Sequence, residues 1–579
     1  MKKFLKKGLA LLLICALAAG SFGACSKKAE KAEDNKETGG TAVTKAADTE
    51  AADTKTAAGI DGWSPFKEKV TITIPVYDRS KEGYPPVDDN YWTKWVQTEF
   101  GDKWNIEVKY VAIPRNDVMT KYSMLIAAGD TPTILMEYDY PKVAQWANDG
   151  AMAELDLKAF AQVAPTYYQK MVDNDQLQYT NLNGKTYFAL SERPYYNCGY
   201  TYAKFFRKDW LDAIGKGVPK NYKEYYEALD AIIAAGLTDQ PPVGYSLQAT
   251  AYVANYAYRD FPVNEEEWAM HSSLGTASLS WKATYELLKR TNSEYNKGYL
   301  SKEFELDVAA AGAGTASQAQ TDFVNGKTFF YDGYMSSNVD WLNAFYENNP
   351  NAKLTVAKVY TGLEEYDGID TTPAYRSDNP FGMIIGFSSV ATPEQLKAAW
   401  MYMEWMSQKD TLFTLENGIE GVTFNYDANK LPVVVADYTG KEMLNHNCNI
   451  DMTCVVHASK VIGTIEDSIK AITPQGLPQD FYQELLDAYN TQLSVTKYAY
   501  TDPIFTKTIE AESEYSATLL SLYQEYSAKL IKCDPAKFDA LYKELSQKYL
   551  DAGYQNIITE RQEAYKNGFT TKLPQNLGK

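Results

Sequence analysis

The sequence has few of the residues on which most catalytic and metal sites depend. Among 579 residues there are three histidines, His271, His446 and His457, and six cysteines. It contains no His-Glu-x-x-His pair for a zinc hydrolase and no Gly-x-Ser-x-Gly turn for a serine nucleophile. We therefore predict no enzyme activity and no cofactor. The 75 acidic residues leave one alternative open, a polysaccharide-degrading hydrolase, because paired carboxylates have no sequence signature.

Basic residues and long apolar runs are also scarce. The chain has 57 Lys and Arg against 75 Asp and Glu, a formal net charge of −18. A nucleic-acid-binding protein needs a basic face, so we expect no nucleic-acid partner. Beyond the N-terminus no apolar run approaches the roughly 18 residues that a membrane-spanning helix needs. The body of the chain is expected to be soluble.

The cysteines are too few for a disulfide scaffold. Cys448 and Cys454 could close a small disulfide loop. With His446 and His457 they also form a set of four possible zinc ligands, whose spacing matches no established zinc pattern. We expect no metal site.

The N-terminus, by contrast, carries a clear signal. Four lysines between Met1 and Lys7 precede an apolar run from about Leu9 to Ala19, and small residues follow. This layout is typical of a secretory signal peptide, here residues 1–24. Cys25 is either incidental to an ordinary export signal or the acylated cysteine of a lipoprotein. Phe22-Gly23-Ala24-Cys25 resembles a lipobox, with Phe where Leu is preferred, and favours the lipoprotein.

Two or more acyl chains such as palmitate on Cys25 would hold the protein stably on a membrane. Residues 25–62 then read as a disordered spacer, because they are rich in Lys, Glu, Asp, Ala and Thr and contain no aromatic residue. We predict a protein anchored by lipid to the extracellular face of the cell membrane, as in Gram-positive lipoproteins.

The remaining 500 or more residues exceed the size of one hydrophobic core, which predicts at least two lobes. Residues 70–77, 105–113 and 133–137 read as strands, and residues 90–100 and 117–128 as the helices between them. This alternation predicts a parallel α/β sheet. Asn183-Gly184 predicts a hairpin turn. Residues 221–235, 392–417 and several segments between 481 and 569 are predicted to be helical.

Several motifs in this order resemble a known family. They are Leu125-Ile126-Ala127-Ala128-Gly129-Asp130-Thr131-Pro132, Arg207-Lys208-Asp209-Trp210-Leu211 with Val218-Pro219-Lys220-Asn221-Tyr222, and Glu416-Asn417-Gly418-Ile419-Glu420-Gly421. The chain resembles the extracellular solute-binding proteins of ABC transporters, in particular the large sugar-binding lipoproteins of Gram-positive bacteria.

The resemblance implies an α/β fold with two lobes, a hinge and a ligand cleft between the lobes, followed by extra C-terminal helices. On this basis lobe I would comprise residues 63–190 with 327–380, and lobe II residues 191–326 with 381–579. Chain crossings would fall near residues 187–196, 326–334 and 379–390. Some relatives carry a calcium loop where this chain has residues 236–242; the required oxygen ligands are missing, so no calcium is expected.

Ligands of open α/β sheets lie beyond the carboxyl ends of strands, so the candidate residues follow strands or lie at the crossings. Aromatic rings can stack on sugar faces, and charged and amide groups can pair with hydroxyls. The chain is rich in tyrosine, with 45 Tyr. The candidates selected in this way are Tyr77, Arg79, Glu137, Tyr138, Asp139, Tyr195, Tyr196, Asn197, Asp332 and Tyr334. Trp281, Trp341 and Arg376 form a second tier of candidates.

Together these features predict a lipid-anchored, monomeric substrate-binding protein that captures a carbohydrate, most simply an oligosaccharide, and delivers it to the permease subunits of an ABC importer. Two alternatives remain open. One is the same fold binding a peptide or another solute, and the other is the secreted hydrolase.

Overall fold

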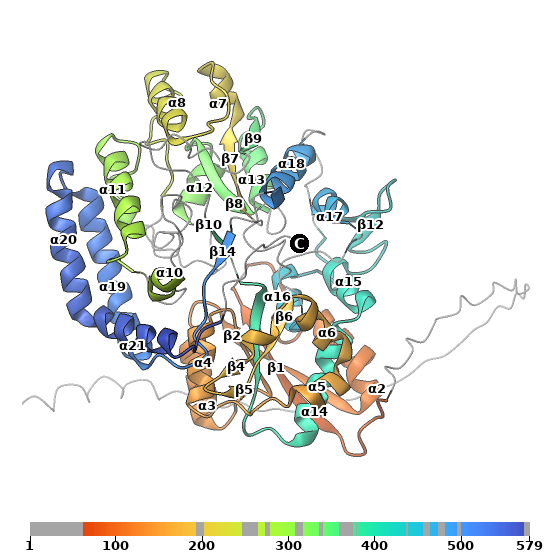
Figure 1. Ribbon diagram of the computed structural model, residues 1–579. Helices are drawn as coiled ribbons and strands as arrows, with labels where there is room; N and C mark the ends of the chain where they lie inside the picture. Colours follow the sequence, from red (N-terminus) through yellow and green to blue (C-terminus); the bar gives the residue numbers. More distant parts are fainter. Residues whose placement is uncertain are drawn as a thin grey trace, which may run out of the picture. The chain divides into compact units, whose positions relative to one another are not determined.

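The computed structural model describes residues 62–80, 82–192, 202–245, 265–271, 278–306, 317–334, 340–357, 375–377, 379–435, 438–455, 462, 464–472, 481–494 and 499–571 (Figure 1). The chain divides into Met1–Asp61, which lies outside these residues, and the compact unit Gly62–Lys579. Cys25 and the predicted signal peptide and spacer therefore lie outside the described residues.

The folded unit begins with two parallel strands, β1 (Val70–Asp78) and β2 (Ile106–Pro114), paired from Val70↔Ile106 to Asp78↔Pro114. Between them the chain forms three short helical segments. The Asn90 side chain caps the first of these by accepting hydrogen bonds from the Trp92 and Thr93 amides. These segments are α1 (Tyr91–Val96), η1 (Gln97–Gly101) and α2 (Asp102–Trp104). The two predicted strands and the helix between them are confirmed.

A second sheet has the order β3-β11-β6 and is antiparallel. Its central strand β11 (Phe381–Phe387) is buried along its whole length and lies between β3 (Ile134–Glu137) and β6 (Ala189–Glu192). The prediction of a purely parallel sheet is wrong here. The strand that fills the centre comes from nearly 250 residues after β3, and local alternation of strands and helices does not reveal such a partner.

Helices surround these strands and share one hydrophobic core with them, which we call the first lobe. They are α3 (Val118–Ala128), α4 (Tyr140–Asn148), α5 (Leu157–Val163), α6 (Pro165–Asp173), η2 (Leu177–Tyr179), α14 (Pro393–Met406), α15 (Lys409–Asn417) and α16 (His446–Thr453). Thr392 and Gln395 form a capping box that starts α14. Met401, Met403 and Met406 of α14 are buried in the core.

Two short hairpins complete this lobe. β4 (Asn181–Leu182) and β5 (Lys185–Thr186) are joined by the predicted Asn183-Gly184 turn, in which both residues have positive φ, 51° and 79°. Asparagine and glycine adopt this left-handed conformation most easily, which explains the turn. The other hairpin pairs β12 (Phe424–Tyr426) with β13 (Pro432–Val434).

The second lobe is built on an antiparallel sheet of order β8-β7-β9. Successive residues of a strand point to opposite faces, so Phe205 and Phe206 of β7 (Tyr202–Arg207) enter two separate cores. The remaining elements are β8 (Phe330–Tyr334), β9 (Leu354–Ala357), α7 (Lys208–Ala213), α8 (Tyr222–Ala234), α12 (Gln318–Val324), α13 (Asp340–Asn348), α17 (Ile465–Ile472) and α18 (Phe481–Ser494).

A helical subdomain has its own core. The helices α19 and α20 run side by side, and α11 packs against α19 (Figure 1). The elements are α10 (Glu265–His271), α11 (Lys282–Asn296), η4 (Phe304–Leu306), α19 (Glu510–Lys532), η7 (Pro535–Lys537), α20 (Phe538–Tyr549), η8 (Leu550–Tyr554) and α21 (Gln555–Lys566). Before α19 the chain forms β14 (Ala499–Thr501), which pairs in parallel with β10 (Tyr375–Ser377).

These pairings correct the predicted division into lobes. Residues 330–357 were expected in lobe I but supply two strands of the second sheet, paired with β7. Residues 381–455 were expected in lobe II but share the core of the first lobe, because β11 pairs with β3 and β6. The predicted crossing at residues 326–334 is likewise wrong, since β8 lies inside the second lobe.

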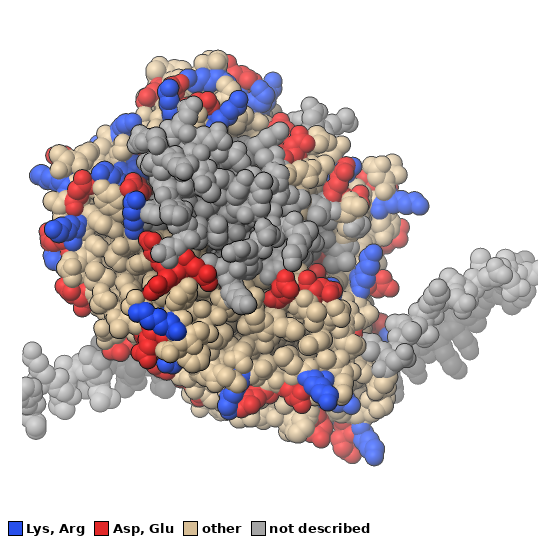
Figure 2. All heavy atoms as spheres, in the orientation of Figure 1, with Lys and Arg blue, Asp and Glu red and all other residues tan. Residues whose placement is uncertain are grey.

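Charged side chains of both signs are intermixed on the face of the molecule that Figure 2 shows. Among the described residues, no helix is both long enough and apolar enough to cross a membrane.

Candidate functional site

The candidate site forms where β1 and β2 end. The last paired residues are Asp78 and Pro114, so Arg79 and Arg115 each lie one residue beyond the pairing. The Arg115 amide donates a hydrogen bond of 2.8 Å to the Asp78 carbonyl, which keeps the two backbones together at this point. Parallel strands present their carboxyl ends at the same edge of a sheet. The register therefore makes the two arginines neighbours.

Glu137, the last residue of β3, lies behind Arg115. The Tyr77 hydroxyl donates to Glu137 Oε2 at 2.6 Å and also lies 2.8 Å from the Met136 carbonyl oxygen. Arg115 Nη1 lies 3.3 Å from Glu137 Oε1. Its guanidinium also lies 4.7 Å from the centre of the Tyr77 ring, within the range of a cation–π contact. Tyr77, Arg115 and Glu137 thus hold one another in place.

Arg79 is paired with a residue from a distant part of the chain. Its Nη1 lies 2.5 Å from Asp451 Oδ2, and the Tyr138 hydroxyl donates to Asp451 Oδ1 at 2.8 Å. Asp451 lies on α16, and the Cys448 thiol of the same helix lies 3.5 Å from the Tyr77 carbonyl oxygen. α16 therefore closes the back of the cluster.

The carboxylates of this cluster are more deeply buried than the arginines that pair with them. The carboxylates of Glu137 and Asp451 are 1% and 2% exposed, whereas the side chains of Arg115 and Arg79 are 18% and 16% exposed. The guanidinium groups are therefore the outer groups of each ion pair. We call Tyr77, Arg79, Arg115, Glu137, Tyr138, Asp139 and Asp451 the strand-end cluster.

The protonation states follow from this arrangement. Burial raises the pKa of Tyr77 and Tyr138, and the neighbouring carboxylates raise it further, so both phenols are neutral donors. Burial by itself would lower the pKa of both arginines. The carboxylate of Asp451 beside Arg79 and that of Glu137 beside Arg115 outweigh this effect, so the pKa of each arginine is raised. Both arginines remain charged at every pH at which the protein is folded.

Asp139 precedes α4 and completes the cluster. Its Oδ2 lies 3.4 Å from Lys142 Nζ, while its buried Oδ1 has no hydrogen-bond partner among the residues that the structure describes. Burial raises the pKa of Asp139, and Lys142 opposes that shift. A buried oxygen without a partner costs free energy unless something else supplies a donor, and a ligand hydroxyl is one such donor.

Five predicted candidates, Tyr77, Arg79, Glu137, Tyr138 and Asp139, therefore lie together. Trp281 and Trp341 do not belong to this group. Trp281 is buried edge-on against Trp268 in the helical part of the chain, and Trp341 is buried against Phe205 in the second lobe. Both rings are packed against other aromatic side chains, away from the strand-end cluster.

The other predicted candidates lie elsewhere. Asp332 and Tyr334 belong to β8 and are paired with Lys204 and Tyr202. Arg376 belongs to β10 and is paired with Tyr500 of β14. None of these strands is in a sheet of the first lobe. Tyr195, Tyr196 and Asn197 lie outside the described residues.

Sequence reasoning missed Arg115 and Asp451. Arg115 follows the second predicted strand directly, so the rule that selected residues after the first and third strands would have found it. Asp451 lies 372 residues after Arg79, on a helix whose sequence gives no sign of its partner. A sequence pattern read locally contains no information about such a contact.

The structure also bears on Cys448 and Cys454 as a possible disulfide pair or as zinc ligands. Cys448 and Cys454 are both free and buried. Burial raises the pKa of Cys448 to about 12 and that of Cys454 further, so both are neutral thiols. The hypothesis of a disulfide between them is wrong. His457 lies outside the described residues, and within the described ranges no group of three or more His, Cys, Asp or Glu side chains could hold a metal ion.

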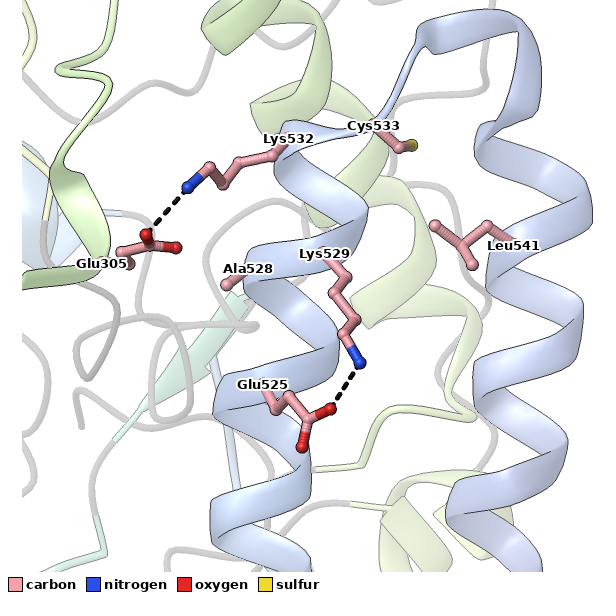
Figure 3. Close-up of a pocket in the computed structure, with 7 residues that line it drawn as sticks. All are labelled: Glu305, Glu525, Ala528, Lys529, Lys532, Cys533 and Leu541. Atoms are coloured by element: carbon pink, nitrogen blue, oxygen red, sulfur yellow. Dashed lines mark hydrogen bonds and ion pairs between the residues drawn. The ribbon is translucent and has the colours of Figure 1, made fainter.

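A shallow depression lies on the helical subdomain, between side chains of α19 and α20 and Glu305 (Figure 3). Its charged groups form two ion pairs, Lys532 with Glu305 at 2.8 Å and Lys529 with Glu525 at 2.5 Å. All four side chains are well exposed, and such pairs contribute little in water. The depression offers no buried polar group to a ligand, unlike the strand-end cluster.

Comparison with known proteins identifies the fold. The family model of bacterial extracellular solute-binding proteins matches residues 85–410, more than half of the chain. The chain belongs to this family. The predicted resemblance is confirmed, and so is the prediction that the chain is not an enzyme, since the family consists of binding proteins.

Individual members resemble the chain over most of its length. The polygalacturonan/rhamnogalacturonan-binding protein YtcQ of Bacillus subtilis is 24% identical over 400 residues, 66% of this chain and 71% of that protein. The crystal structure of the alginate-binding protein AlgQ2 without calcium ion covers 86% of this chain and 99% of its own, with 16% identity and a TM-score of 0.57. FusA of Streptococcus pneumoniae in complex with kestose has 12% identity over the same shares and a TM-score of 0.54. These structures confirm the two-lobed α/β fold.

Proposed function

We propose that this solute-binding protein captures an oligosaccharide and delivers it to the permease subunits of an ABC importer. The observation that carries the proposal is the strand-end cluster, in a chain that belongs to the family. The names of the relatives support the choice of ligand, since polygalacturonan, alginate and kestose are all carbohydrates of more than one sugar unit.

The chemistry of the strand-end cluster suits a sugar. Tyr77 and Tyr138 have ring centres 6.0 Å apart, and Arg115 lies within cation–π range of both. A sugar presents apolar C–H faces and a rim of hydroxyls, so it needs aromatic surface together with fixed donors and acceptors. The half-buried Tyr138 ring supplies the surface, and the guanidinium groups and Asp139 supply the polar partners.

We further propose that residues 1–24 are removed as a signal peptide, that Cys25 is acylated, and that residues 25–62 act as a spacer. A binder without catalytic activity has to work close to its transporter. A lipid anchor provides this by keeping the local concentration at the membrane high. The protein then acts as a monomer on the extracellular face of the cell membrane.

Isothermal titration calorimetry on the chain from Ser26 onward tests the ligand class. The panel contains oligosaccharides of two to six units, both neutral and acidic, and peptides of similar mass. Saturable binding to at least one oligosaccharide, with no release of new reducing ends, is the expected result. Binding to peptides alone contradicts the proposal, and reducing ends that accumulate with time favour a hydrolase.

Fractionation of cells that express the full chain tests the anchor. The Cys25→Ser variant is expected to leave the membrane fraction and appear in the medium. Cys533→Ser, the same change on the helical subdomain, is the matched control and should remain with the membrane. A Cys25→Ser protein that stays in the membrane fraction contradicts acylation at this residue.

A further inference from the structure

The two arginines of the strand-end cluster follow neighbouring, paired backbone positions. Arg79 and Arg115 each follow the final pair of a parallel register, Asp78↔Pro114. Their guanidinium groups lie 5.8 Å and 4.7 Å from the centre of the same Tyr77 ring. Each charge opposes the other, and the charge of Arg79 lowers the pKa of Arg115 to a small extent. Two like charges that lie around one aromatic ring favour an anion that can contact both.

The two carboxylates paired with the arginines lie on their buried side, and the third carboxylate of the cluster, Asp139, is paired with Lys142. Glu137 and Asp451 are almost fully buried and are also engaged by the hydroxyls of Tyr77 and Tyr138. They cannot move outward to cover the exposed side of the guanidinium groups. The exposed side of the two guanidinium groups is therefore more positive than their buried side, which faces the carboxylates.

Within the described part of the chain, both guanidinium groups also retain donors without a hydrogen-bond partner. The hydrogen bonds of Arg79 to Asp451 and of Arg115 to Glu137 all engage Nη1, and those of Arg115 are long, 3.3 Å and 3.5 Å. A guanidinium has five N–H donors in a planar fork that fits a carboxylate with two parallel hydrogen bonds. Stacking on an aromatic ring holds that fork in one plane. Geometry and charge thus match a planar anion.

We propose that the oligosaccharide contains a uronic acid and that its carboxylate binds between Arg79 and Arg115. This inference rests on the proposed function and specifies its ligand class. The Tyr138 ring lies 5.4 Å from the Arg115 guanidinium and provides a surface for the same sugar unit. The unpartnered Oδ1 of Asp139 accepts a hydrogen bond from a hydroxyl.

The test compares trimers that differ in charge. Trigalacturonate and trimannuronate are titrated into the chain from Ser26 onward, alongside the methyl esters of the same trimers and neutral maltotriose. At least one free acid should bind at least 10-fold more tightly than its ester, because the ester lacks the charge that strengthens hydrogen bonds to the guanidinium groups. The advantage should shrink when the salt concentration is raised.

The outcomes separate this inference from the proposed function. If maltotriose or the esters bind as tightly as the acids, the protein is an oligosaccharide binder and the uronate inference is wrong. If no acid trimer binds but a neutral sugar of the wider panel does, the uronate inference is again wrong and the proposed function still holds. If no oligosaccharide of any kind binds, the proposed function itself is wrong.

A charge-conserving variant tests the residues. Arg115→Lys keeps a cation beside Glu137 but loses the planar fork, and affinity for the acid trimer should fall at least 10-fold. Arg290→Lys is the matched control, since Arg290 on α11 of the helical subdomain stacks at 4.4 Å on Tyr222 of α8, away from the strand-end cluster. Circular dichroism and the thermal midpoint show whether each variant is folded. A folded Arg115→Lys protein with unchanged affinity for the acid overturns the assignment.

Discussion

Single residues of the strand-end cluster depend on one another, and Asp451 is the most connected of them. It accepts from both Arg79 and Tyr138 while being 2% exposed. Asp451→Asn removes the charge that balances Arg79 and leaves a cation facing a neutral amide. We expect the free energy of unfolding, measured in urea, to fall by about 2 kcal/mol or more, since removing one partner of a buried ion pair is costly.

The matched control is Asp539→Asn. Asp539 is paired with Lys289 at 3.0 Å, but its side chain is 67% exposed. Exposed pairs contribute between about 0 and 1 kcal/mol, so this variant should be close to the parent protein. Equal losses in the two variants would show that Asp451 does not stabilise the cluster.

His271 gives the fold a predictable dependence on pH. Burial, and then the charge of Arg561, lower its pKa to about 4 from an ordinary 6.5. Between these values the unfolded chain binds a proton that the folded protein does not. The free energy of unfolding should therefore decrease as the pH falls from 6.5 towards 4, with about 2 kcal/mol lost between pH 7 and 5 from this residue.

Urea unfolding at pH 7 and pH 5 measures this contribution as a difference between proteins. His271→Gln removes the titrating group. Between pH 7 and pH 5 the free energy of unfolding of this variant should therefore fall by about 2 kcal/mol less than that of the parent protein. Carboxylates contribute similarly to both proteins and cancel in the comparison. The same loss in both would contradict the lowered pKa of His271.

At the residue scale, one local rule selected residues that the structure places together. Tyr77, Arg79, Glu137, Tyr138 and Asp139 were found because they follow predicted strands. Their partner Asp451 was not found, because complementary charge across 372 residues leaves no trace in either segment. Trp281 and Trp341 were chosen for their residue type, and burial decided their role instead.

At the scale of secondary structure, helix α6 depends on a residue outside itself. It starts at Pro165, and the preceding Ala164 has no side-chain acceptor. Glu404 of α14 accepts hydrogen bonds from the Thr166 and Tyr167 amides at 2.9 Å and 3.0 Å. Glu404→Ala leaves both buried amides without a partner. The free energy of unfolding in urea should fall by about 2 kcal/mol or more.

Glu394→Ala is the control for this change. Glu394 is exposed in the first turn of the same helix α14. Its removal costs only a favourable interaction with the helix dipole, typically about 0.3–1 kcal/mol. A Glu404→Ala protein as stable as Glu394→Ala would show that α6 needs no cap from α14.

Elements whose signals are local were predicted correctly, such as β1, α3 and the Asn183-Gly184 hairpin. The capping of α6 by Glu404 was not predictable, because the acceptor and the helix start are 237 or more residues apart in the sequence. The antiparallel sheet was missed for the same reason. β11 is apolar throughout and could pair equally well in several sheets, so its sequence does not select a partner.

At the scale of the whole molecule, the family and the two-lobed fold were predictable from motifs in a fixed order. The distribution of segments between the lobes was not. The chain leaves the first lobe after β6 and returns with β11, and the intervening strands β8 and β9 pair with β7. Only long-range strand pairing establishes which segments belong together.

The central claim is that the strand-end cluster is where the oligosaccharide binds. A crystal structure of the protein with a bound acid trimer tests it most directly. We predict a sugar carboxylate within about 3 Å of the guanidinium groups of both Arg79 and Arg115. A sugar bound elsewhere, with no contact to any residue of the strand-end cluster, would contradict the account.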